Sequence, residues 1–257
     1  MDIGVRGRTA VVLGSTSGLG WAVAQGLGRE GANVVVVGRR AELARERAES
    51  LPSAIGVAAD LTEPDAPATV LRSAREAFGE VDVLVLNGGG PAPSVAEDMS
   101  GEDVETATRL LVRPHVELVG GVLPGMRQRH WGRIVAIGST GVQQPIPTLA
   151  ASNVGRAALA GYLKSLAGDV AADGVTVNMV LPGRIDTDRV TSVDRSTAER
   201  TGRTEEEVRR ESQAGIPVGR YGRPEELAAV VVFLAGDAAS YVTGEQVRCD
   251  GGMVRCH

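Results

Sequence analysis

The chain has 257 residues, of which 43% are apolar and 23% charged, a balance typical of a globular protein. Its net charge of -5 offers no basic surface to gather phosphate backbones, so we expect no nucleic-acid partner. No apolar run approaches the roughly 20 residues that cross a membrane, and we expect a soluble, cytoplasmic protein without a membrane partner. The cysteines, Cys249 and Cys256, lack metal-ligand spacing, which predicts reduced thiols and no metal site.

Short β-branched runs alternate with longer segments of helical period along the whole chain. Strands are predicted at 9–13, 33–37, 54–59, 81–86, 132–137, 175–181 and 245–249. Helices are predicted near 18–30, 40–51, 64–78, 101–128, 151–172 and 223–236. This alternation is typical of βαβ units. We expect one α/β domain over 1–257, a doubly wound Rossmann fold whose seven-stranded, mostly parallel sheet carries helices on both faces.

The segment 187–215 departs from this alternation, because it is rich in Arg, Glu, Ser and Thr and poor in apolar residues. A polar helix is expected near 204–213. We favour a substrate lid over an exposed surface insertion, since loops near ligand sites often gate access. Arg184, Arg189 and Arg195 hint at an anionic substrate group, although a solvated charge pattern is the simpler explanation.

A glycine-rich turn connects the first predicted strand to the first predicted helix. Its residues are Gly14, Ser15, Thr16, Ser17, Gly18, Leu19 and Gly20. Glycines let the backbone approach a pyrophosphate, and the helix N-terminus adds partial positive charge. A strand-to-helix turn can also use glycines without any ligand. The turn therefore predicts a dinucleotide site only in combination with other motifs.

The end of the second predicted strand bears on the choice of cofactor. An acidic side chain there would bind the ribose hydroxyls of NAD and repel a phosphate. Gly38 stands at this position, followed by Arg39 and Arg40. These two arginines either hold the 2′-phosphate of NADP or form a solvated pair at the start of a helix. NADP(H) is predicted, and NAD(H) is less favoured.

The Gly-x-x-x-Gly-x-Gly spacing resembles that of the short-chain dehydrogenase/reductase family, and in particular its 3-oxoacyl-acyl-carrier-protein reductase-like members. Further motifs agree in order over nearly the whole chain. They are Asp60-Leu61, Asn87-Gly88-Gly89-Gly90, Pro182-Gly183-Arg184-Ile185-Asp186-Thr187 and Asp250-Gly251-Gly252. The resemblance implies that Asp60 and Leu61 lie on the adenine side of the cofactor, Asn87, Gly88 and Gly89 beside it, and Pro182, Gly183, Ile185 and Thr187 near the nicotinamide.

The same resemblance implies a catalytic Ser, Tyr, Lys and Asn, of which only Ser139 is retained. Ser152 stands at the Tyr position, Arg156 at the Lys position and Leu111 at the Asn position. In the family the Tyr exchanges the substrate proton, and the Lys lowers its pKa. Ser152 is shorter than Tyr, and its hydroxyl has a higher pKa. Arg156 keeps a cation that can bind a ribose or a phosphate, but a guanidinium does not relay protons.

Three hypotheses stay open for this degenerate tetrad. The chain is an atypical NADP-dependent oxidoreductase that acts on a CH–OH/carbonyl pair of a small molecule and takes the proton from water, the substrate or an unrecognised residue. Alternatively it is a non-redox enzyme on the same scaffold, or a catalytically silent NADP-binding regulatory protein. His115 is a possible proton shuttle, although helix packing or a subunit interface explains it better.

The resemblance also implies a homo-oligomer, a tetramer or a dimer. An apolar face in the segment 101–128 would suit burial against a neighbouring subunit, and it would equally suit packing in the core. Its members are Val112, Val116, Val119 and Val122.

Overall fold

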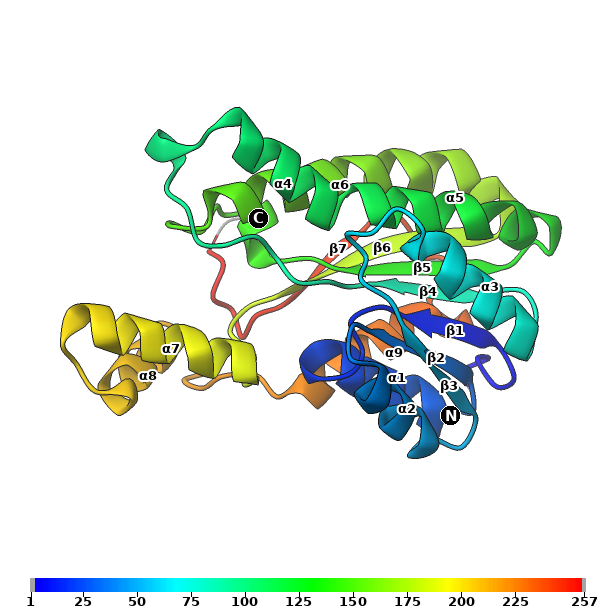
Figure 1. Ribbon diagram of the computed structural model, residues 1–257, viewed down its shortest axis with the longest axis horizontal. Helices are drawn as coiled ribbons and strands as arrows, with labels where there is room; N and C mark the ends of the chain where they lie inside the picture. The colour runs from blue at the N-terminus through cyan, green and yellow to red at the C-terminus, as the bar shows by residue number, and fades with distance from the viewer. Residues whose placement is uncertain (1–2, 256–257) are drawn as a thin grey trace.

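The computed structural model describes residues 3–255 and contains one seven-stranded sheet in the order β3-β2-β1-β4-β5-β6-β7 (Figure 1). Every neighbouring pair is parallel, which confirms the predicted fold class. The strands are β1 (Thr9–Val12), β2 (Asn33–Gly38), β3 (Ala54–Ala58), β4 (Val83–Leu86), β5 (Gly132–Ile137), β6 (Val175–Pro182) and β7 (Gln246–Cys249).

Helices cover both faces of the sheet. They are α1 (Gly18–Arg29), α2 (Ala41–Glu49), α3 (Ala66–Phe78), α4 (Gly101–Leu111), α5 (Arg113–Gln128), α6 (Ala150–Val170), α7 (Asp188–Thr201), α8 (Glu205–Ala214) and α9 (Pro224–Ala235). Successive strand residues point to opposite faces, which explains the valine runs. In β1, Val12 belongs to the apolar cluster that includes Leu27 of α1 and Leu227 of α9, whereas Val11 belongs to the cluster on the other face, with Leu118 of α5 and Leu163 of α6.

The direction of winding reverses between β1 and β4. From β1 the chain proceeds outward through β2 to β3, and it then returns to β4 and proceeds the other way to β7. In open parallel sheets, the crevice at the carboxyl ends of the strands beside such a reversal is the usual ligand site.

The prediction of one helix over 101–128 was wrong, because the chain breaks between α4 and α5. Val112 leaves the helical region with φ -121° and ψ -61°. Pro114 lies in the first turn of α5, where its missing N–H is tolerated, but it could not continue a helix from α4. Val119 and Val122 of the predicted apolar face lie in the core, while Val112 and Val116 are half-buried.

The segment 187–215 contains two helices where one was predicted. Gly202, with φ +66°, ends α7, and a capping box of Thr204 and Glu207 starts α8. Figure 1 shows the two helices as an arm beyond the rest of the molecule. The buried carboxylate of Asp194 in α7 anchors this arm by accepting hydrogen bonds from Arg184 at 3.1 Å and from the Tyr221 hydroxyl at 2.8 Å.

No helix within residues 3–255 has the length and apolar character needed to span a bilayer. In the same part of the chain, no three His, Cys, Asp or Glu side chains gather as metal ligands would. Cys249 carries a free thiol, and Cys256 lies outside the described residues.

Candidate functional site

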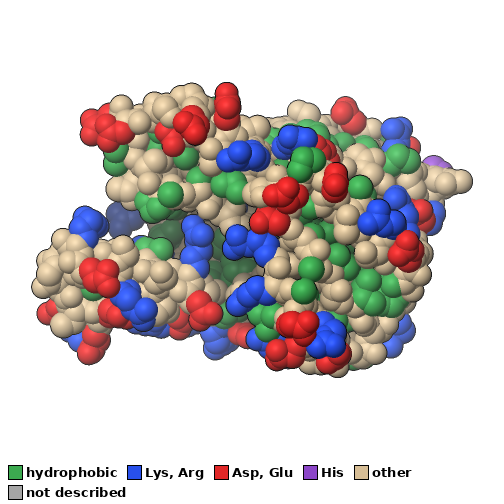
Figure 2. Space-filling view, viewed as in Figure 1, with side chains coloured by type: hydrophobic (Ala, Val, Ile, Leu, Met, Phe, Trp, Pro, Cys, Tyr) green, Lys and Arg blue, Asp and Glu red, His purple; other side chains and the backbone are tan. Residues whose placement is uncertain are grey.

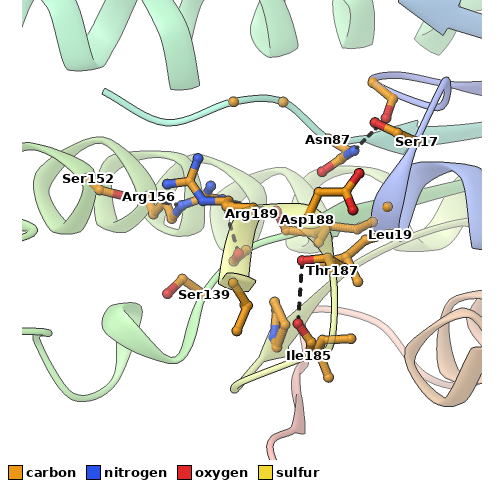
Figure 3. Close-up of a pocket in the computed structure, with 18 of the residues that line it drawn as sticks. Ser17, Leu19, Asn87, Ser139, Ser152, Arg156, Ile185, Thr187, Asp188 and Arg189 are labelled. Atoms are coloured by element: carbon orange, nitrogen blue, oxygen red, sulfur yellow. Dashed lines mark hydrogen bonds between the residues drawn. The ribbon is translucent and has the colours of Figure 1, made fainter. Parts of the chain in front are cut away.

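A cavity of about 360 Å³ opens at the carboxyl ends of the central strands, in the crevice that the topology predicts (Figure 3). It brings together residues from the glycine turn, the ends of β4, β5 and β6, and the start of α6 and α7. The predicted site residues that line it are Gly14, Ser17, Gly18, Leu19, Asn87, Gly88, Gly89, Ser139, Ser152, Arg156, Pro182, Gly183, Ile185 and Thr187.

The glycine turn exposes backbone to this cavity. Gly14 and Gly18 have φ of +55° and +57°, a region that residues with a Cβ rarely adopt. The Asn87 side-chain amide donates to the carbonyls of Leu13 at 3.1 Å and Gly14 at 3.3 Å, which fixes the turn against the end of β4. Together with the N-terminus of α1, this bare backbone fits the pyrophosphate of a dinucleotide.

Three residues of the turn support it without lining the cavity. The Ser15 hydroxyl donates to the Val12 carbonyl at 2.6 Å and accepts from the Val37 amide at 2.9 Å, so it joins β1 to β2. Thr16 is buried. A Cβ on Gly20 would lie only 2.3 Å from the Gly14 carbonyl oxygen, so helix α1 approaches the turn too closely for a side chain there.

Close packing against Thr16 leaves no room for an acidic side chain at the end of β2. A Cβ on Gly38 would lie 2.5 Å from Cγ2 of Thr16, so Gly38 lies directly against the glycine turn. Arg39 and Arg40 follow on the surface. Hydrogen bonds from the amide and hydroxyl of Thr62, together with the charge of Arg39, lower the pKa of Asp60.

These adenine-side candidates lie outside the cavity. Arg39 and Arg40 are exposed, Asp60 is half-buried, and Leu61 packs at the edge of the core. The charge of Arg39 acts on the Asp60 carboxylate, so the end of β2 and the end of β3 face each other. An adenosine moiety would therefore lie across an open surface.

Arg156 is held at the tetrad position by backbone carbonyls. Its Nη1 donates to the carbonyls of Ile137 at 3.1 Å and Gly138 at 3.0 Å, and its Nε donates to the Ser152 Oγ at 3.3 Å. Burial and the charge of Arg189 lower the pKa of Arg156 to about 10. At neutral pH the guanidinium is still protonated, so this side chain supplies a fixed positive charge.

The hydroxyls of Ser139 and Ser152 at the cavity each accept one hydrogen bond from the protein. Ser139 Oγ accepts from the Gly141 amide at 3.0 Å, and Ser152 Oγ accepts from Arg156. A hydroxyl that accepts from the protein keeps its own O–H for a further partner. Both serines can therefore donate to an oxygen atom in the cavity.

Leu111 lies outside the cavity. Its side chain is 1% exposed, and a Cβ on Gly155 would lie 2.9 Å from Leu111 Cδ1, so this side chain packs α4 against α6. His115 is also buried, with Nδ1 2.8 Å from the Leu111 carbonyl oxygen, and burial lowers its pKa. Its Nε2 lies 4.0 Å from the position that a Cβ on Gly88 would take, so the imidazole is packed beside the end of β4.

The sequence analysis did not identify five of the cavity residues as part of a site: Ile137, Gly138, Leu149, Asp188 and Val190. The sequence analysis named Arg189 together with Arg184 and Arg195 as a hint of an anionic substrate group, without distinguishing among the three. The structure separates the three, because Arg184 pairs with Asp194 and Arg195 pairs with Glu205. Their sequence spacing carried no signal for this difference, which depends on the fold of α7 and α8.

Comparison with known sequences gives a match over residues 14–254 to the family described as Enoyl-(Acyl carrier protein) reductase. The chain is 34% identical over 248 residues to the 3-oxoacyl-acyl-carrier-protein reductase of Escherichia coli, covering 96% of this chain and 97% of that protein. It is 33% identical over 252 residues to the D-beta-hydroxybutyrate dehydrogenase of Rhizobium meliloti, covering 95% and 98%.

Solved structures agree with this result. The L-sorbose reductase from Gluconobacter frateurii, complexed with NADPH and L-sorbose, matches with a TM-score of 0.94 and 34% identity over the whole of both chains. A variant of the actinorhodin polyketide ketoreductase with NADPH matches with a TM-score of 0.91 and 31% identity, over 97% of this chain and 98% of that one.

Proposed function

The chain belongs to the short-chain dehydrogenase/reductase family, and we propose that it is an NADPH-dependent reductase of a small carbonyl compound that works without the usual Tyr–Lys pair. One observation carries the proposal: the cavity joins the glycine turn to Ser139, Ser152 and Arg156. A site for the dinucleotide is thus kept beside hydrogen-bond donors and a cation. The proposed activity is tested by measuring whether one NADPH is consumed for each carbonyl group reduced.

The cofactor is NADP(H). The similar sorbose reductase and polyketide ketoreductase structures hold NADPH. In this chain, contact with Thr16 keeps a carboxylate away from position 38, and Arg39 and Arg40 offer forked donors to a 2′-phosphate.

Arg39→Ala is expected to weaken NADPH binding by about ten- to a hundredfold and to leave NADH binding nearly unchanged, because charge-assisted hydrogen bonds to the phosphate are lost. Titration calorimetry with both cofactors measures the effect. Arg29→Ala, which removes an exposed arginine from the last turn of α1, is the matched control. Equal affinity of the unmodified protein for NADPH and NADH would contradict the assignment.

When bound along the glycine turn, NADPH would supply the hydride for the carbonyl carbon. The O–H groups of Ser139 and Ser152 donate to the carbonyl oxygen and orient it. The Arg156 cation stabilises the negative charge that develops on that oxygen, as fixed donors do in an oxyanion hole. Because Arg156 keeps its proton, the oxygen takes its proton from water.

We also propose that α7 and α8 form a substrate lid. Asp188, Arg189 and Val190, at the start of α7, line the cavity, so movement of the arm would change access to it. We further propose a cytoplasmic homo-oligomer, a dimer or tetramer. Val104 of α4 and Val154 of α6 support this assembly, because they are 41% and 39% exposed on neighbouring helices.

A further inference from the structure

Two arginines at the cavity lack an acidic partner. Within residues 3–255, no carboxylate forms an ion pair with Arg156 or Arg189. Most arginines of the arm are paired, including Arg195 with Glu205, 2.8 Å apart. Two like charges in a partly desolvated cavity repel each other. The protein therefore holds an uncompensated positive charge where a substrate would lie.

The two guanidinium groups converge on the same space. A Cβ placed on Gly90 would lie 3.7 Å from Nη2 of Arg189, 3.9 Å from Nη2 of Arg156 and 3.6 Å from Oγ of Ser152. Figure 3 shows the two arginine side chains next to each other near Ser152, while Ser17 and Leu19 of the glycine turn lie away from them. The Nη2 atoms of both guanidinium groups and a hydroxyl thus lie around one small region beside Gly90.

We infer that this region binds a carboxylate of the substrate, so that the compound reduced is a small oxo acid. A planar carboxylate accepts paired hydrogen bonds from the Arg189 guanidinium. Its charge also offsets the repulsion between Arg189 and Arg156, whose Nε and Nη1 already donate to Ser152 and to backbone carbonyls. This inference rests on the proposed function for the carbonyl group, but the anion site depends on the two arginines alone.

The surroundings favour a substrate anion over a cofactor phosphate. The phosphate-binding features, Gly14 and Gly18, belong to the turn at the other side of the cavity, whereas Arg189 reaches towards Gly90 and Ser152. Asp188 also lines the cavity, yet its carboxylate forms no ion pair with either arginine. Figure 2 shows cationic side chains around the hollow beside the arm, which would attract an anion from solution.

The size of the site limits the acid. The cavity measures about 360 Å³, near the lower end of the range for ligand pockets, and the nicotinamide end of the cofactor must share it. A short oxo acid fits in the remainder. Acetoacetate and its neutral, isosteric amide, acetoacetamide, are therefore suitable substrate probes, and malonate is a suitable probe that cannot be reduced at a ketone.

The test compares Arg189→Gln with Arg200→Gln, which removes an exposed arginine from the same helix. Malonate binding to the NADP⁺-loaded protein is measured by calorimetry, and reduction of both acetoacetate probes is measured by NADPH oxidation. Arg189→Gln is expected to weaken malonate binding by about ten- to a hundredfold. The unmodified protein is expected to reduce acetoacetate more efficiently than acetoacetamide by a similar factor, and Arg189→Gln is expected to abolish this difference. Arg200→Gln is expected to change neither, and Arg189→Lys is expected to restore part of the binding.

The two possible failures can be distinguished. Malonate binding that Arg189→Gln leaves unchanged, or no malonate binding at all, would overturn the anion site even if acetoacetamide is reduced. Malonate binding that depends on Arg189, without reduction of either probe, would support the anion site and overturn the proposed function. Thermal unfolding of each variant shows whether a loss of binding reflects a loss of fold, and the Arg189→Lys variant decides the case if Arg189→Gln unfolds.

Discussion

Ser152→Tyr combined with Arg156→Lys is expected to raise NADPH-dependent reduction of a small neutral ketone by about 10²–10⁴, the usual contribution of a positioned general acid. Ser152 faces the cavity, so a phenol at this position would extend towards the substrate. A Lys at position 156 could use the Ile137 and Gly138 carbonyls that now hold Arg156, and its charge would lower the pKa of the new phenol. The two changes belong together, because groups that act as a unit contribute non-additively.

The matched control is Ser152→Phe with Arg156→Lys, which fills the same space without a proton to donate. Ser139→Ala in the Tyr–Lys background is expected to remove much of the gain. Leu111→Asn is left out of the variant, since an amide in the packed contact between α4 and α6 would be buried without a partner. If the folded, NADPH-binding double variant is no faster than the Phe control, the missing proton donor is not what limits the reaction.

Gly18→Val is expected to weaken dinucleotide binding by a hundredfold or more. Gly18 has φ +57°, where a β-branched residue is strained, and its Cβ would occupy the path by which a phosphate approaches the turn. The nearest atom to that Cβ is the Thr187 Cγ2 at 3.8 Å, so the fold itself has room for the change. Fluorescence titration with NADPH measures the binding, and circular dichroism follows the helices.

The control for backbone strain is Gly79→Val. Gly79 has φ +82° and open space around its Cβ position, but it follows α3, away from the cavity. This variant should lose some stability and keep its NADPH affinity. An unchanged affinity in Gly18→Val would show that the turn has only a structural role.

The sheet could be predicted from the sequence because a strand buried on both faces needs continuous apolar runs. Such runs at Val34–Val37 and Val83–Leu86 locate β2 and β4 closely. Helix α7 was missed because its exposed surface is polar nearly all round, and its main anchor, the buried Asp194, bonds to residues distant in sequence. The break at Val112 was missed because apolar periodicity continues across it.

The glycine turn and the tetrad positions could be identified because they occupy fixed places along the chain. The roles of Ser15 and Gly20 were not apparent, since they depend on how closely the turn packs on its neighbours. The sequence also could not show that Leu111 packs inward or that Arg189 reaches Gly90. Both depend on where α4 and α7 lie relative to α6, which local patterns do not encode.

Hydride transfer from NADPH is the reaction that tests the proposed function most directly. NADPH that carries deuterium at both C4 positions of the nicotinamide is incubated with the unmodified protein and a panel of small oxo acids and ketones, and the products are examined by mass spectrometry. We expect an alcohol that carries one deuterium for each NADPH oxidised. Conversion of a substrate without deuterium and without NADPH oxidation would instead indicate a non-redox enzyme, and tight NADPH binding without any conversion would indicate a silent binding protein; either result would contradict the account.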